Sequence, residues 1–329
     1  MSRSGRWSGR VESTDESSLQ DGGVRANKAK DFSHSTRGGS RLSARRLAEI
    51  AGDLTERDLG IVFALARLRV ASGAQLERLC FTEITNSARG RIRRRVMARL
   101  IGLGLVVTLD RRVGGVRAGS AGLVYTLSGA GWRLVDLLDK NSETTRRRTR
   151  ETPGAMFLSH ALAISAVYVD LVEQALVCGV EISVFDVEAD ARWPDGTGQI
   201  LRPDALVAVS SGGVEDIWWL EVDLGTESLA RIRRMLDRYR QFARDAETGP
   251  LGVVPRVLVT VVDDKRLRDV QWLIRRSDAP EGLLQVVRQS DVGSDLVRQL
   301  IGDNVPGLAS EAGLASELKL EPRRETQPP

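Results

Sequence analysis

The chain has 329 residues, with 48 Lys and Arg against 44 Asp and Glu and a formal net charge of +4. This length exceeds the roughly 100–200 residues of a typical domain, so we expect two domains with flanking tails. Two distant cysteines and two histidines argue against a disulfide framework and a Cys/His zinc site. Neither a signal peptide nor an apolar stretch long enough to span a bilayer is recognised, which predicts a cytoplasmic protein without membrane contact.

Polar segments are expected to bound the ordered regions. Residues 1–52 are rich in Ser, Gly and Arg, and such a composition cannot bury enough apolar surface to offset its ordering entropy. We therefore predict a disordered basic arm there, a linker at 141–153 and a disordered tail at 303–329. The two predicted domains span 53–140 and 154–302, and the fold class is mixed α/β (α+β).

The pattern of the first domain is typical of a winged helix. Thr55, with Asp58 three residues on, predicts the start of a helix over 55–71. A short helix over 74–80 and a third helix from Asn86 or Ser87 to about Ile101 should follow. Strands at 105–109 and 123–127 would form the hairpin called the wing, and a helix over 128–139 would close the domain.

Arginine dominates the third helix and the wing. Nine arginines and the single acid Asp110 occur between Asn86 and Arg117. The alternative interpretation is a solvated charged face, but arginines four residues apart repel each other unless an anion neutralises them. We therefore predict contacts with double-stranded DNA, with the helix in the major groove. The candidate contact residues are Arg89, Arg91, Arg94, Arg95, Arg99, Arg111, Arg112 and Arg117.

The second domain should run helix, three strands, helix, strand. The predicted ranges are 160–178, 180–187, 200–209, 216–223, a helix from Gly225 and a strand over 253–262. Alternation in the third strand places Glu221 and Asp223 on one face together with Trp219. Unpaired carboxylates near apolar groups require a cation or hydrogen-bond donors. The tryptophans are expected in the core or in a pocket wall: Trp193, Trp218, Trp219 and Trp272.

The order of elements, with Pro203-Asp204 before one strand and Glu221 on the next, resembles the PD-(D/E)xK nuclease family and its αβββαβ core. This resemblance implies that Asp204 and Glu221 hold Mg²⁺, with Asp223 as a third ligand or a group that orients water. Asp223 stands where such nucleases have lysine. The basic role would then pass to Arg231 or Arg234. The alternative is that these arginines form a structural ion-pair network with Glu221 and Asp223.

The chain is also similar to the replication-relaxation family of actinobacterial plasmids and integrated elements, over roughly residues 55–265. The most specific stretch runs Glu-x-Asp-x-Gly-Thr-Glu from Glu221 to Glu227, together with Arg202-Pro203-Asp204 and His160. The resemblance implies a role in plasmid replication or DNA topology, with plasmid replication proteins as further partners. Taken alone, His160 would more often be an ordinary helix-start residue than a ligand.

Three functions from different classes are candidates for this sequence. The first is a Mg²⁺-dependent DNA endonuclease targeted by the winged helix. The second is a non-catalytic regulator of replication or transcription that binds DNA and has a degenerate nuclease fold. A relaxase with a tyrosine nucleophile is disfavoured, because such enzymes need clustered histidines and this chain has only His34 and His160. Whether the protein forms a homodimer is left open.

Overall fold

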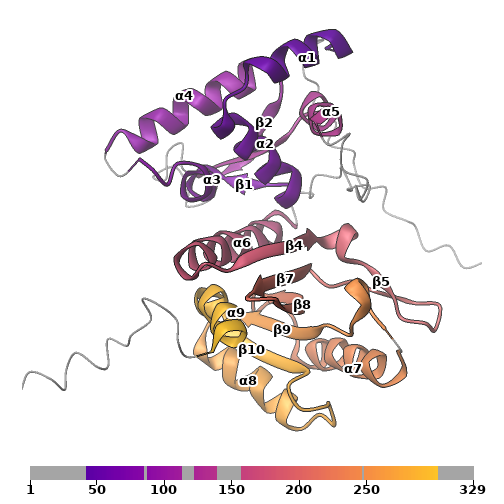
Figure 1. The fold of residues 1–329 in the computed structure, drawn as a ribbon. Coiled ribbons are helices and arrows are strands. Elements are labelled where there is room, and N and C mark those ends of the chain that lie inside the picture. Colours follow the sequence, from indigo (N-terminus) through magenta and orange to yellow (C-terminus); the bar gives the residue numbers. More distant parts are fainter. Residues whose placement is uncertain (1–41, 85–86, 113–121, 139–156, 247, 303–329) are drawn as a thin grey trace, which may run out of the picture. The chain divides into compact units, whose positions relative to one another are not determined.

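The N-terminal block combines helices with a small antiparallel sheet of strand order β1-β3-β2 (Figure 1). The computed structural model describes residues 42–84, 87–112, 122–138, 157–246 and 248–302. In chain order the block contains α1 (Ala44–Asp53), α2 (Glu56–Leu68), β1 (Ala71–Ser72), α3 (Gly73–Cys80), α4 (Arg89–Gly102), β2 (Val106–Arg112), β3 (Leu123–Leu127) and α5 (Gly129–Leu138).

Local capping explains why α2 and α3 begin where they do. The Thr55 backbone N–H donates to the Asp58 carboxylate at 2.8 Å, and the Asp58 N–H donates to Thr55 Oγ1 at 3.3 Å. Ser72 and Gln75 repeat this reciprocal arrangement at the start of α3. Each cap satisfies N–H groups that have no partner inside the helix. The predicted helix start at residue 55 is therefore confirmed to within one residue.

Helix α1 corrects the predicted boundary of the basic arm. Residues 44–52 were expected to be disordered, but they form a helix that Ser43 caps and that packs on α5. Leu47 and Ile50, three residues apart, bury their side chains in the core of the block. Their helical spacing was hidden by the polar composition of the segment as a whole. The rest of the arm, the predicted linker and the predicted tail lie outside the described residues.

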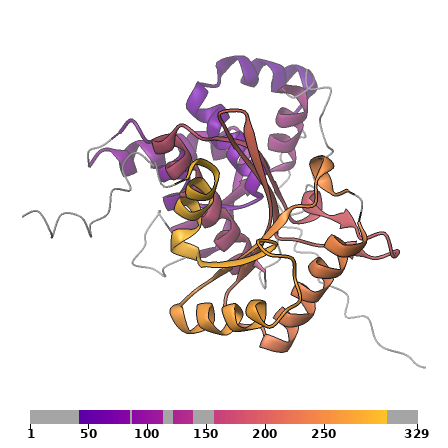
Figure 2. The ribbon, with the colours of Figure 1, turned by 60° about the horizontal axis from the view of Figure 1, so that its bottom comes forward.

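The C-terminal block is built on a five-stranded mixed sheet of order β10-β9-β8-β7-β4 (Figure 2). Strands β4, β7 and β8 pair antiparallel, whereas β8, β9 and β10 pair parallel. The elements are α6 (Leu158–Cys178), β4 (Glu181–Val187), η3 (Glu188–Ala191), β5 (Trp193–Pro194), β6 (Ile200–Leu201), β7 (Ala205–Ser211), β8 (Val214–Asp223), α7 (Leu229–Asp245), η4 (Pro250–Gly252), β9 (Arg256–Val261), α8 (Asp264–Arg275), β10 (Leu284–Arg288), η5 (Gln289–Asp291) and α9 (Val292–Ile301).

One predicted strand is divided in the structure. The range 200–209 was expected to be continuous, but β6 ends at Leu201 and pairs with β5, and β7 starts at Ala205. Pro203 lies between them, and proline lacks the N–H that a strand ladder needs. Asp204 follows this break and directly precedes β7. Otherwise the helix, three strands, helix and strand occur in the predicted order.

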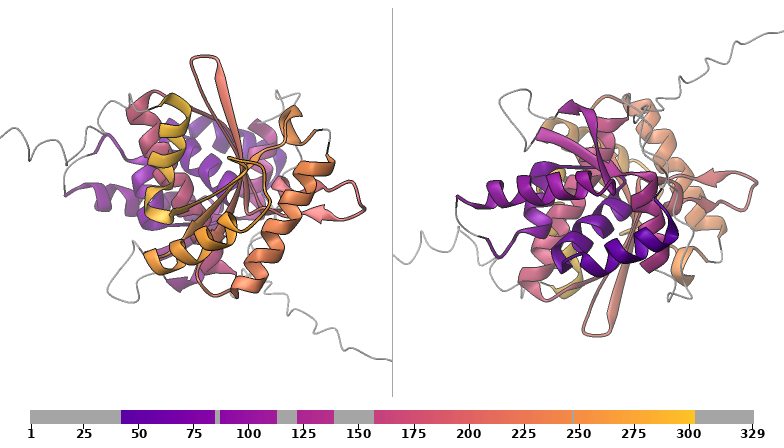
Figure 3. Two further views of the ribbon diagram at one scale, coloured as in Figure 1. Left: turned by 90° about the horizontal axis from the view of Figure 1, so that it is seen from below. Right: turned by 90° about the horizontal axis from the view of Figure 1, so that it is seen from above.

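Helices cover both faces of the sheet (Figure 3). On one face, Trp218 and Leu220 of β8 pack in a cluster with residues of α6 and α9. On the other face, Trp219 packs with residues of α7 and α8. Both indole side chains are completely buried. The predicted alternation in β8 is thus confirmed, and it places Glu221 and Asp223 on the side of α7 and α8.

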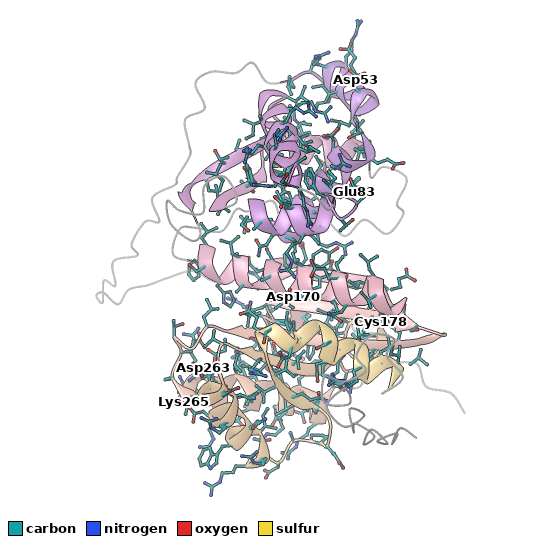
Figure 4. All side chains as sticks on the ribbon, turned by 90° about the vertical axis from the view of Figure 1, so that its left-hand side faces the viewer. Asp53, Glu83, Asp170, Cys178, Asp263 and Lys265 are labelled. Atoms are coloured by element: carbon teal, nitrogen blue, oxygen red, sulfur yellow. The ribbon has the colours of Figure 1, made fainter. Side chains whose placement is uncertain are left out.

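Polar contacts of α6 join the two blocks. Arg78 of α3 donates to Asp170 and to Glu173 of α6, each at 2.6 Å, and Figure 4 marks Asp170 on this helix. Contrary to the expectation that no apolar stretch is long enough to span a bilayer, α6 is long and apolar enough by length and composition, and it is the only such helix among the described residues. However, 44% of its most apolar window is buried inside the protein. The packing of Val167 and Leu171 against the sheet is that of a core helix.

Cys80 ends α3 in a half-buried position, and burial raises the pKa of its thiol to about 12, although the nearby Arg57 charge lowers it. The thiolate is the reactive form, and a free cysteine has a pKa near 8.5. At about pH 8 we therefore expect Cys80 to be alkylated by iodoacetamide roughly tenfold or more slowly in the native chain than in urea. Peptide mass spectrometry against time would measure this. Equal rates would contradict the burial argument.

Candidate functional site

Asp204 is held against β8 through both backbone and side chain. Its N–H donates to the Leu220 carbonyl at 2.9 Å, and its Oδ2 accepts from the Val222 N–H at 2.7 Å. Its Oδ1 lies 2.8 Å from Nε2 of His160, in the first turn of α6. The contacts with Leu220 and Val222 place the Asp204 carboxylate next to the part of β8 that carries Glu221. The sequence motif therefore marks a fixed carboxylate and not a solvent-exposed turn.

His160 belongs to this site. The hydrogen bond to Asp204 raises the pKa of the imidazole, burial opposes that shift, and the negative charges of Asp204, Glu188 and Glu227 add to it. The structure thus brings His160 next to Asp204, 44 residues further along the chain. His160 does lie at the start of α6, as expected, and its ring is in addition engaged by Asp204. In the sequence, His160 was singled out only as part of the resemblance to the replication-relaxation family.

Glu221 lies beside Asp204 and accepts a hydrogen bond from the Tyr239 hydroxyl of α7. Burial raises the pKa of Glu221 well above its usual value, and the Asp204 charge raises it further. The Tyr239 hydrogen bond and the Arg238 charge partly offset this. A carboxylate whose proton affinity is raised by burial and by a neighbouring negative charge favours a cation or a proton beside it. Tyr239 was not predicted here, because its spacing in α7 indicates only a packed position.

Asp223 has a different environment from the other two acids. Its side chain is buried and forms an ion pair with Arg266 of α8, and its Oδ1 accepts from the Gly225 N–H at 2.9 Å. Arg266 also donates to the Glu227 carbonyl at 2.7 Å. A cation was expected here from α7, but the structure supplies it from α8. Asp223 is therefore neutralised by a guanidinium of its own.

The arginines predicted to replace the motif lysine lie elsewhere. Arg231 is exposed and pairs with Glu227 at 2.8 Å. Arg234 is also exposed on α7. Within the described chain, neither forms a hydrogen bond or ion pair with Asp204, Glu221 or Asp223. The proposed ion-pair network through Arg231 and Arg234 is wrong in its partners, because Arg266 fills that place for Asp223 only.

Glu188 is a further acid that the sequence did not indicate. It follows β4 with a φ of 47°, in the left-handed region that non-glycine residues rarely adopt. Its N–H donates to the Asp204 carbonyl at 2.8 Å. Burial raises the pKa of the Glu188 carboxyl, and the Asp204 charge adds to the effect. The site thus gathers acids from several elements around His160.

The predicted set of three metal ligands is not assembled. Among the residues that the structure describes, no group of three or more His, Cys, Asp and Glu side chains is placed to hold a metal ion. Asp223 is engaged by Arg266, which leaves Asp204 and Glu221 as adjacent carboxylates. Carboxylate oxygens are suitable ligands for Mg²⁺, which commonly needs only one or two from the protein. Asp204 and Glu221 are therefore the two carboxylates of this site that could hold such an ion.

A second candidate surface lies on α4, where six arginines divide into two groups. Arg89 and Arg93 contact Glu77 of α3, and Arg99 pairs with the buried Asp58 of α2. Arg91, Arg94 and Arg95 are exposed, and no carboxylate of the described residues pairs with them. Arg111 and Arg112 belong to β2, but their side chains are not described, and Arg117 lies outside the described residues.

Residues 63–257 match the model of the replication-relaxation family, which covers more than half of the chain. The protein therefore belongs to the replication-relaxation family, as the motif around Glu221 predicted. No curated protein matches this chain. The family description suggests a role in replication or relaxation.

Proposed function

We propose that this protein binds double-stranded DNA in plasmid replication or relaxation. In this proposal α2, α3 and α4 with the β2–β3 hairpin form a winged helix, and α4 enters the major groove. The order of three helices followed by a hairpin supports this interpretation. Family membership supports a role in replication or relaxation.

The observation that carries the proposal is the division of the α4 arginines. Arg89, Arg93 and Arg99 anchor the helix to α2 and α3, so they keep its orientation. Arg91 and Arg95, four residues apart on the exposed side, repel each other unless an anion lies nearby. DNA phosphates and guanine edges are the anionic and acceptor groups that arginine recognises. The anchored and the exposed arginines thus have separate roles.

The test is the double variant Arg91→Ala with Arg95→Ala. We expect its affinity for a labelled duplex to fall roughly tenfold or more near 0.15 M salt, with a salt slope smaller by about two. Fluorescence anisotropy at several salt concentrations measures both quantities. The matched control is Arg45→Ala with Arg46→Ala on α1, which removes the same charge from arginines paired with Glu49. Equal affinities of parent and α4 variant would remove α4 as the DNA contact.

A second candidate function is Mg²⁺-dependent cleavage of phosphodiester bonds. The observation in its favour is that Asp204 forms hydrogen bonds with the backbone on both sides of Glu221, and that burial together with the Asp204 charge raises the pKa of Glu221. The strand order β9-β8-β7-β4, with helices α6 and α7, is compatible with an αβββαβ nuclease core. In this proposal the two carboxylates hold the ion, His160 orients Asp204 and Tyr239 orients Glu221. A bound magnesium ion would activate water and offset charge on the scissile phosphate.

The alternative is a non-catalytic regulator with a degenerate nuclease core. The Asp223–Arg266 ion pair favours this alternative. Asp223 stands where the resembled nucleases have lysine, and Arg266 neutralises this acid. Arg238 is exposed, and its positive charge lowers the pKa of Glu221. It could contact a phosphate whether or not the protein cleaves DNA. DNA binding is common to both functions, so cleavage alone separates them.

A further inference from the structure

Trp272 of α8 is an exposed aromatic side chain on a basic surface. It was expected in the core or in a pocket wall, but it remains 47% exposed. Trp218 and Trp219 are fully buried, as predicted. The guanidinium of Arg276 lies 4.5 Å from the centre of the Trp272 ring, in the arrangement of a cation–π contact. An indole that keeps nearly half its surface in water can stack on a flat ligand.

Arginines surround this indole on α8. Arg268, Arg275 and Arg276 are exposed, and none forms an ion pair with another described residue. With Trp272 they fall at positions i, i+4, i+7 and i+8, which share one side of a helix. Lys265, marked in Figure 4 at the start of α8, is instead paired with Asp269 at 2.8 Å. The unpaired cations therefore gather around the aromatic ring.

The neighbouring helix α7 extends the basic surface. Arg233 of α7 and Arg276, which directly follows α8, line a cavity of about 400 Å³ between the two helices. The carboxylates of this cavity, Asp237 and Asp278, lie 3.2 Å and 3.0 Å from nitrogens of Arg240. Arg244 also lies 3.9 Å from Asp278, so Arg240 and Arg244 together balance the two acids, and Arg233 and Arg276 remain available for an anion.

We propose that this α7–α8 surface, formed by Arg233, Arg268, Trp272, Arg275 and Arg276, binds single-stranded DNA. Single strands present both phosphates and open base faces, and proteins bind them with cationic grooves that carry aromatic stacking platforms. In duplex DNA the base faces are stacked on each other, so Trp272 would favour an unpaired strand. The surface is separate from α4, and the inference does not rest on duplex binding there.

The test measures binding of a labelled oligo(dT) of about 15 nucleotides by fluorescence anisotropy. Trp272→Ala should lower the affinity about tenfold, because stacking on one base is lost. Trp272→Phe keeps an aromatic ring and should stay within about threefold of the parent. Arg268→Ala with Arg276→Ala should lower both the affinity and its salt slope. Equal thermal midpoints of parent and variants would show that the fold is retained.

The matched control is the α4 double variant, Arg91→Ala with Arg95→Ala, which should bind oligo(dT) like the parent. Trp272→Ala should in turn bind duplex DNA like the parent. The proposal is overturned if Trp272→Ala binds oligo(dT) as tightly as the parent. It is also overturned if Trp272→Phe loses as much affinity as Trp272→Ala, because the ring would then have no stacking role.

Discussion

Replacing Asp223 by alanine is expected to lower the free energy of unfolding by about 3–5 kcal/mol. The side chains of Asp223 and Arg266 are 3% and 12% exposed, so the variant leaves a guanidinium buried without its carboxylate. The Gly225 N–H loses its acceptor as well. Arg266 keeps its contact with the Glu227 carbonyl, which cannot neutralise the charge. Urea denaturation of the full chain, followed by circular dichroism, measures the change.

Two further variants show whether this loss comes from the buried pair. Asp269→Ala removes a carboxylate that pairs with the exposed Lys265, so it should cost less than about 1 kcal/mol. Replacing Asp223 and Arg266 together by leucine should recover most of the lost stability, because no buried charge then remains unpaired. A loss below about 1 kcal/mol for Asp223→Ala would mean that the pair is not structural. Asp223 would then be available as the third metal ligand that the family resemblance implies.

Local rules were sufficient to predict most elements of the fold. The capping box at Thr55 and Asp58 involves residues three apart, so the sequence alone indicates the start of α2. Alternation along β8 likewise separates Trp218 from Trp219, which enter clusters on opposite faces of the sheet. Segment-wide composition was a weaker guide. It concealed α1, whose buried residues are Leu47 and Ile50.

Contacts distant in sequence limited the prediction of the site. Arg91, Arg95 and Arg99 form one stripe by spacing, yet Arg99 pairs with Asp58, 41 residues earlier. Asp223 pairs with Arg266, 43 residues later, and not with the cations that follow it on α7. Tertiary packing determines both of these ion pairs, and the periodicity of the sequence does not reveal them. Asp204 and Glu221 were predicted to lie on neighbouring strands because the motif of the resembled family places them there, and β7 and β8 do pair.

Loss of DNA cleavage in Asp204→Ala and Glu221→Ala is the outcome that would establish a nuclease. With Mg²⁺ or Mn²⁺ the parent should nick supercoiled DNA, and each variant should be slower by about a hundredfold or more, since an ion held by both carboxylates supplies several kcal/mol. The conversion of supercoiled to open-circular DNA on gels measures the rate. Duplex affinity should be unchanged in both variants, because α4 carries the proposed contacts.

Asp216→Ala is the matched control for this cleavage assay. Asp216 lies on β8 with Glu221, but it pairs with Arg256 and does not contact Asp204 or His160. This variant should therefore cleave like the parent, whereas a general effect of losing an acid from β8 would slow it too. If the parent nicks nothing, or if Asp204→Ala and Glu221→Ala cleave as fast as the parent, the nuclease hypothesis is wrong. The carboxylates beside His160 would then be a remnant in a protein that only binds DNA.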